Sequence, residues 1–590
     1  MLLTLLLTSL GSTALEPAVP HSNYLLALTP EESVSVLAIG NLDEMRASSR
    51  KNSYFRFAQD EEVVAFVDEI AGGAMEKLLA ELQVEQVLGS DVDLEAFFAS
   101  LHGSIVLFSQ MPNQDPNNTM LGLMIELGDD RSGFDQVFSR LMERVANEVT
   151  ISGSDHLGVP LMSLQPKEPG AEGVLHMAEL GDAVILMGGA SGPACMAELH
   201  KIIDRWAGTS ATGGLLENER FKAGRQSLGF DPNIECHVDV QALWTSLRNS
   251  GELRHADLPE VLLDEIGQIQ WFHGGARVGV GEELDFQLGL AMPQEGILAS
   301  FAGLFGGVPV DLMSQVPRQS SSLSSLTIDL HGLFNRCLDL VRSFNEDEFQ
   351  EVQRSMQGVA DMGIDIEGDF LAQLTGGYVR FSVEVPAAES LLGMAGAMVG
   401  TANGDDPLPT YASATIIGLQ DPSRVEAAVD KLIETFNQQK LTTELANGRQ
   451  AHAINFGPAG IHWAFSPDSM IISMQPTPIA EALRMMSDDS LSIMDKGRFA
   501  ELIQSNRKSL HLTICDTATN LKSILGGLQS TSRMLPMLSM MSDFKLPKEF
   551  PINARTAWPA PNIVGRYFEG TVSTAVTWDE ISLRFRLSSK

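Results

Sequence analysis

The sequence predicts an α+β protein with two homologous tandem domains, each a mainly antiparallel sheet with helices packed on it. Short motifs of the N-terminal half recur in order in the C-terminal half, shifted by 287 residues at Pro30 and Pro317 and by 278 at Phe221 and Phe499. Paired strand-like segments around short turns outnumber strand–helix–strand units, which favours antiparallel pairing. The 590 residues are also too many for one hydrophobic core.

Further matched motifs lie at turns, helix starts and strand ends. They are Phe57-Ala-Gln-Asp-Glu61 with Phe344-Asn-Glu-Asp-Glu348, Asp93-Leu-Glu95 with Asp365-Ile-Glu367, Asn218-Glu-Arg-Phe221 with Lys496-Gly-Arg-Phe499, and the strand-ending Asp239 with Asp516. Chance would not preserve both their order and their spacing. We therefore infer an internal duplication, which fixes the architecture but does not by itself reveal a function.

The elements of each repeat follow from local patterns. An opening strand, a helix after an acidic turn, a strand pair, an amphipathic helix, a hairpin and a final alternating strand are expected in that order. In the first repeat the amphipathic helix shows helical spacing of Phe134, Val137, Phe138, Leu141 and Val145. In the second repeat the same spacing joins Val425, Val429, Leu432, Ile433 and Phe436.

These patterns set the domain boundaries. Residues 1–14 read as a signal peptide, because a short apolar run is followed by small residues that include Ser12 and Ala14. Repeat 1 is expected over 24–293 and repeat 2 over 323–590. The linker, 294–322, contains an apolar segment, residues 297–305, that we interpret as an interdomain helix. No other apolar run is long enough to span a bilayer, so no transmembrane segment is expected after the leader.

Charge narrows the class of partner. The chain has 40 Lys and Arg against 76 Asp and Glu, a net charge of -36. Such a surface repels phosphate backbones, and no basic stripe offsets it, so nucleic-acid binding is not expected. We interpret the acidity as a solubility feature of an exported protein, located in the periplasm, the cell envelope or the extracellular space.

The sequence contains no standard catalytic signature, and no cofactor or metal is predicted. The acidic turns lack the alternating ligand pattern of a calcium loop. His176 and His462 are the matched polar pair, each six residues before a turn aspartate, and a structural role is favoured for both. His237 has no counterpart in the second repeat. An alternative, a hydrolase with an unrecognised site, would use carboxylates around His452 and His462.

An insert of the second repeat, residues 385–409, is the candidate interaction surface, because long loops in compact domains are often functional. Its candidate contact residues are Leu391, Met394, Met398, Asp405 and Asp406. A helix packed on its own domain is the other interpretation of this insert.

A third function, the carrier of an apolar ligand, would place Met534 and Met537 in an internal pocket, although methionine is mostly core filler. Of the cysteines, Cys236 and Cys515 lie near equivalent strand positions. We expect buried thiols there, with a bridge between the repeats as the alternative.

The layout resembles a group of predicted secreted bacterial proteins classed only as a domain of unknown function. The resembling features are the proline-led opening strand, the acidic turn before an amphipathic helix, and an Arg-Phe pair ahead of a strand that ends in aspartate. In this sequence they are Pro30 and Pro317, Phe221 and Phe499, and Asp239 and Asp516. The resemblance implies export and two α+β repeats, but no activity and no catalytic residues.

Together these observations favour an exported, non-enzymatic binding protein or structural protein of the cell envelope, with an unknown protein or envelope component as its partner.

Overall fold

The computed structural model describes residues 24–71, 94–129, 131–168, 173–210, 213–250, 260–281, 283–386, 410–436, 438–444, 449–456, 459–486, 492–525, 559, 561–568, 571–578 and 583–589. The chain forms two compact units. The first contains residues 1–59, 71–294 and 580–584, and the second contains 60–70, 295–579 and 585–590. Both combine helices with an antiparallel sheet, so the predicted fold class is confirmed.

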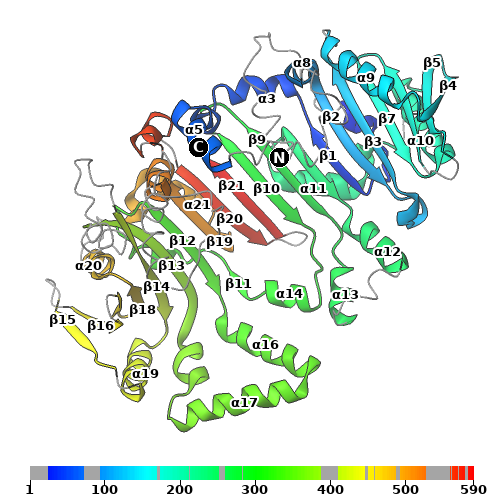
Figure 1. The fold of residues 1–590 in the computed structure, drawn as a ribbon. Coiled ribbons are helices and arrows are strands. Elements are labelled where there is room, and N and C mark those ends of the chain that lie inside the picture. Colours follow the sequence, from blue (N-terminus) through cyan, green and yellow to red (C-terminus); the bar gives the residue numbers. More distant parts are fainter. Residues whose placement is uncertain are drawn as a thin grey trace. The chain divides into compact units, whose positions relative to one another are not determined.

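The first unit has a sheet with strand order β4-β5-β6-β7-β3-β2-β1-β8-β9-β10, and every neighbouring pair is antiparallel (Figure 1). Its strands are β1 (Ser35–Ile39), β2 (Leu101–Gln110), β3 (Met120–Leu127), β4 (Val149–His156), β5 (Val159–Pro166), β6 (Val174–Leu180), β7 (Ala183–Gly189), β8 (Ile234–Val238), β9 (Phe272–Val278) and β10 (Leu284–Leu290). Its helices are α2 (Tyr24–Leu28), α3 (Leu42–Ser49), α4 (Ser53–Ala58), α8 (Leu94–Ala99), α9 (Ser132–Val145), α10 (Gly192–Trp206), α11 (Glu219–Leu228), α12 (Val240–Ser250) and α13 (Glu260–Ile266).

The second unit repeats this order as β15-β16-β17-β18-β14-β13-β12-β19-β20. Its strands are β11 (Phe305–Gly306), β12 (Ser322–Ile328), β13 (Leu374–Val385), β14 (Thr410–Leu419), β15 (Leu441–Glu444), β16 (Gln450–Phe456), β17 (Ala459–Phe465), β18 (Ser469–Ser473), β19 (His511–Asp516) and β20 (Thr571–Trp578); β21 is Leu583–Ser589. Its helices are α5 (Glu61–Ala71), α14 (Ile297–Ala302), α15 (Val310–Met313), α16 (Leu330–Phe344), α17 (Glu346–Asp361), α19 (Pro422–Thr435), α20 (Pro476–Met485) and α21 (Gly497–Ser505).

Register makes the two units comparable residue by residue. Ser35 lies opposite Ser109 and Val238 in the first unit, as Ser322 lies opposite Ser382 and Cys515 in the second. The first hairpin carries a bulge in both units, and each bulge contains a glycine with positive φ, 52° at Gly103 and 85° at Gly376. That conformation favours glycine because it has no Cβ.

The repeated strand-ending aspartate caps the next helix. Asp239 Oδ1 accepts a hydrogen bond from the Ala242 backbone N–H at 2.8 Å, and Asp516 Oδ1 accepts one from Thr519 at 2.8 Å. These carboxylates satisfy N–H groups that a helix start leaves unpaired. Local capping chemistry therefore explains why the motif recurs.

Helices cover the sheet of the first unit unevenly. On one face, α2, α10 and α11 pack on the strands around Phe108, Met124 and Ile185. On the other face, α3, α8 and α9 cover a separate apolar cluster that includes Ile39 and Phe134. The centre of this second face is left without a helix among the described residues, as the exposure of its side chains shows below.

The apolar segment 297–305 differs from its prediction. The helix α14 spans only Ile297–Ala302, and Phe305 begins the short strand β11, which pairs with β12 of the same unit. The glycine at the helix end, Gly303, has a low helix propensity. The segment is therefore part of the second unit rather than a helix between domains.

All four cysteines lie within the described residues, and no disulfide joins them. Buried thiols were predicted at Cys236 and Cys515. Both are free thiols, but only Cys515 is buried, and Cys236 is half-buried. In the part of the chain that the structure describes, no helix has the length and apolar character needed to cross a membrane.

Candidate functional site

An exposed apolar surface lies at the centre of the first unit's sheet. Leu37 on β1, Leu107 on β2 and Leu121 on β3 expose 41%, 44% and 56% of their surface. Leu37 lies directly opposite Leu107, and Leu107 lies opposite Leu123 of β3, so strand alternation places all four on one face. We call Leu37, Leu107, Leu121 and Leu123 the leucine strip.

The strip continues along the same row of the sheet in both directions. Beyond Leu123 the row reaches Leu186 of β7, and beyond Leu37 it reaches Cys236, Gly274 and Leu288 on β8, β9 and β10. This row contains no charged side chain. Leu123 and Leu186 also pack against the cluster that α3, α8 and α9 cover, so the open strip borders a part of the same face that helices already bury.

The second unit has polar residues in the same places. Register equates the four leucines of the strip with Ser324, Arg380, Ser413 and Thr415. Ser413 there shares a hydrogen bond with Ser382, whose hydroxyl lies 2.9 Å away. The scaffold therefore folds without leucine at these positions, and strip exposure is a property of the first unit alone.

The strip was missed in the sequence, although a signal was present. Residues 105–108 read Ile-Val-Leu-Phe, whereas 378–381 read Tyr-Val-Arg-Phe. A strand that is apolar at every position has two apolar faces, and both are expected to be buried or to contact a partner. A strand that alternates apolar and polar residues has one face in solvent.

A second candidate site is a polar pocket in the second unit, with a cavity volume of about 390 Å³. We call it the Lys496 pocket. Its walls come from the opening loop, the ends of β13 and β14, and the helices near residues 481, 496 and 519. The lining residues are Gln319, Ser321, Val383, Glu384, Tyr411, Glu481, Lys496, Asp516 and Thr519.

Lys496 supplies the positive charge of this pocket. Its Nζ donates to the Ser320 backbone carbonyl at 2.8 Å and lies 4.2 Å from the centre of the Phe499 ring. Burial lowers the pKa of the Lys496 ammonium, and the nearby Asp516 carboxylate opposes that shift. An ammonium has three donors, so N–H groups remain for a ligand.

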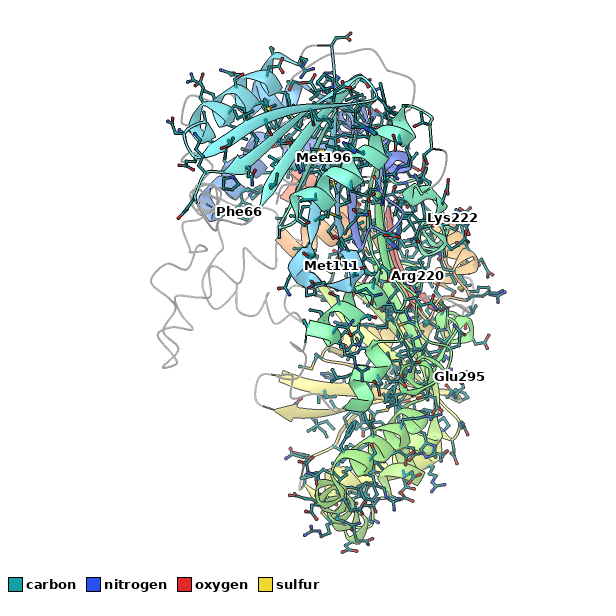
Figure 2. The ribbon with its side chains drawn as sticks, turned by 90° about the vertical axis from the view of Figure 1, so that its right-hand side faces the viewer. Phe66, Met111, Met196, Arg220, Lys222 and Glu295 are labelled. Carbon is teal, nitrogen blue, oxygen red and sulfur yellow. The ribbon has the colours of Figure 1, made fainter. Side chains whose placement is uncertain are left out.

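The first unit pairs its matching aspartate with a cation from a different position, Arg220, whose counterpart in the second unit is Arg498. Asp239, the counterpart of Asp516, accepts from Arg220 at 2.7 Å through both carboxylate oxygens. Arg220, labelled in Figure 2, projects from α11 and ties that helix to the end of β8. In the described part of the second unit, by contrast, Lys496 donates to the Ser320 carbonyl and forms no ion pair with Asp516.

The matched histidines occupy the same sheet position. His176 lies opposite Met187, and His462 lies opposite the equivalent Ser473. His176 is buried, with Nδ1 2.8 Å from the Ser163 hydroxyl and Nε2 3.0 Å from the Gly192 carbonyl. Both ring nitrogens are thus used to hold β5, β6 and the start of α10 together, which is a structural role.

His452 and His462 do not form a site together. His452 lies opposite Trp463 on the neighbouring strand, and His462 lies opposite Ala453. A shift of one residue along a strand reverses the face, so the two imidazoles project from opposite sides of the sheet. The two imidazoles therefore do not meet in one site, as the alternative of a hydrolase around this pair requires.

A buried polar cluster of the first unit was also missed. Nδ1 of His237 lies 3.2 Å from Nδ1 of His273, and both residues are almost fully buried. The edge of the Phe221 ring faces both imidazoles, with ring centres 5.3 and 5.4 Å apart. Glu235 Oε2 lies 3.6 Å from His273 Nε2. Only the pairing of β8 with β9 brings these side chains together.

The candidate contact residues of the insert, Leu391, Met394, Met398, Asp405 and Asp406, lie outside the described residues, as do Met534, Met537 and the leader at 1–14. Among the described side chains, no group of three or more His, Cys, Asp or Glu is arranged to hold a metal ion.

Comparisons with known proteins add little. No protein-family model matches the chain, and no curated protein matches it. One solved structure, "Structure of crystal form I of TP0453", aligns with 50% of this chain and 88% of its own, at 9% identity and a TM-score of 0.21. A likeness at that level supports no conclusion about fold or function.

Proposed function

We propose that this protein is a non-enzymatic binding protein whose first unit captures the apolar face of an amphipathic helix of another protein on the leucine strip. The observation that carries the proposal is the exposure of Leu37, Leu107 and Leu121 at positions where the homologous unit has Ser324, Arg380 and Ser413. Exposed apolar surface that the fold does not need points to an interaction.

The surroundings of the strip favour a helix as the occupant. Helices α8 and α9 already pack beside the strip on the same face, and a helix is the usual cover for a half-open sheet. A further helix laid beside them would complete this layer. Because the strip itself is uncharged, the contacting side of that helix must be apolar.

The negative charge of the chain predicts which residues lie beside the apolar face of the partner helix. The chain carries a net charge of -36, so a helix with basic residues beside its apolar face is attracted to it and an acidic helix is repelled. We also propose that the protein is exported to the cell envelope. This part of the proposal is supported by the sequence of residues 1–14 alone, which lie outside the described residues.

The test transfers residues between the two units. The triple variant Leu37→Ser, Leu107→Arg, Leu121→Ser places the second unit's residues in the first, which the scaffold accommodates. A synthetic basic amphipathic helix with one leucine face should bind the natural chain, and the variant should bind it about tenfold more weakly or worse, measured by fluorescence anisotropy. Thermal melting of both proteins should be similar, because the strip is already exposed.

Matched controls decide between occupants. The reverse variant of the second unit, Ser324→Leu, Arg380→Leu, Ser413→Leu, should gain affinity for the peptide. A peptide of the same composition in scrambled order should not bind. Equal peptide binding by the natural chain and the triple variant would refute the proposal. So would strip-dependent binding of neutral phospholipid vesicles without peptide binding, or strip-dependent dimerisation of the chain.

A further inference from the structure

We infer that the Lys496 pocket of the second unit binds a small zwitterion that carries a primary ammonium and a carboxylate, such as a free amino acid. This inference is independent of the proposed function, because the pocket and the leucine strip belong to different units. A volume of about 390 Å³ is within the range of small-molecule sites.

The charges of the pocket are complementary to both ends of such a ligand. Lys496 supplies a cation, and Glu384 and Asp516 supply carboxylates. Glu481, the remaining carboxylate, already has a cation as its partner, because its Oε2 accepts from Arg484 Nη2 at 2.7 Å and from Gln319 Nε2 at 2.6 Å. The groups left for a ligand are therefore one ammonium and two carboxylates.

The ion pairing of the strand-ending aspartate differs between the two units. In the first unit, Arg220, whose counterpart is Arg498, pairs directly with Asp239 at 2.7 Å, and Asn218 stands at the position of Lys496. In the second unit, Lys496 is anchored on the Ser320 carbonyl instead, and Asp516 uses one oxygen to cap the following helix. The ammonium and the carboxylate face the same cavity without meeting.

A zwitterion can bridge this gap with two charge-assisted contacts. Its carboxylate would accept from the free N–H groups of Lys496, and its ammonium would donate to Asp516 and Glu384. Tyr411, whose hydroxyl bonds with Thr519, forms a wall beside these carboxylates. Burial first, and then Glu384, raise the pKa of Tyr411, so this wall stays uncharged at neutral pH.

The experiment is calorimetric titration of the full chain with three ligand sets. The first set is free α-amino acids, the second is the matching amines without the carboxylate, and the third is the matching carboxylic acids without the ammonium. At least one amino acid should bind, and its matched amine and acid should bind about tenfold more weakly or worse. No binding of any amino acid would overturn the inference, and so would an amine that binds as tightly as its amino acid.

Two pocket variants and one control locate the site. Lys496→Met retains the aliphatic length without the charge, and Asp516→Asn retains an oxygen for the helix cap. Each should weaken amino-acid binding by about tenfold or more. Lys508→Met, at an exposed position of the same unit, should change nothing. Unchanged affinity in Asp516→Asn with an unchanged melting temperature would refute the site, even if Lys496→Met fails to fold.

Discussion

Replacement of His237 by isoleucine, the residue at the equivalent position of the second unit, should make the first unit more resistant to acid. His237 is 1% exposed, and burial first, then His273 and Arg220, lower its pKa from 6.5 to about 3. Between these two values the unfolded chain binds a proton at this site that the folded chain does not. The free energy of unfolding of the natural chain therefore falls as the pH drops from 6.5 towards 3.

The size of this effect follows from the shift in pKa. A difference of about 3.5 units corresponds to a loss of about 5 kcal/mol over the whole window, or about 1.4 kcal/mol for each pH unit. No further loss from this group is expected below the folded pKa. Guanidinium unfolding between about pH 7 and about pH 4 measures it, followed by the tryptophan emission of the chain, to which the buried Trp271 of the first unit contributes.

The controls separate this histidine from general acid sensitivity. The double variant His237→Ile, His273→Ser takes both positions to the residues of the second unit, Ile514 and Ser573, and leaves neither imidazole without a partner. Of these proteins, the double variant should have the free energy of unfolding that changes least with pH. His331→Gln removes a histidine whose side chain is 39% exposed. The free energy of unfolding of this variant should change with pH as steeply as that of the natural chain. Identical slopes in the natural chain and the double variant would contradict the assignment.

Loss of the Arg277 guanidinium should destabilise the first unit by about 3–5 kcal/mol. Arg277 Nη2 lies 2.5 Å from Asp285 Oδ2, and the Asp285 side chain is fully buried. The residues face each other across β9 and β10. In Arg277→Met, the buried Asp285 carboxylate loses this ion pair and Glu283 loses its 3.0 Å contact with the same guanidinium, and breaking one side of a buried pair costs more than the pair itself is worth.

A second change should restore most of this loss. In Arg277→Met, Asp285→Leu the buried carboxylate is removed together with its cation, only the partly exposed Glu283 loses a partner, and apolar replacements of a buried pair are often neutral. The surface pair Arg248 and Asp264, with side chains 54% and 55% exposed, gives the comparison. Arg248→Met should cost less than about 1 kcal/mol. Urea unfolding measures all three variants, and equal losses for Arg277→Met and Arg248→Met would show that burial does not matter here.

Sequence patterns predicted the architecture because strands, turns and helix caps depend on contacts between residues that are close together in the sequence. Three kinds of local signal appear in both units. They are the alternating strand residues, the turn aspartates six residues after His176 and His462 (Asp182 and Asp468), and the strand-ending Asp239 and Asp516. The two capping contacts at 2.8 Å show the physical reason for the last of these motifs. Even so, the helix predicted over 297–305 ends at Ala302, because Phe305 pairs with Ile328 of β12 and is part of a strand.

The candidate sites depend on contacts between distant segments, which no single stretch of sequence specifies. The leucine strip joins β1, β2 and β3 across a face whose exposure depends on where the helices end, and the Lys496 pocket joins residues from 319 to 519. His237 and His273 looked unrelated until β8 paired with β9. By itself the sequence determined the duplication, the fold class and the excess of negative charge, because each is a property of order and composition. Only the tertiary structure decided which face stays open and which charges remain apart, because burial and strand register are properties of the packed chain.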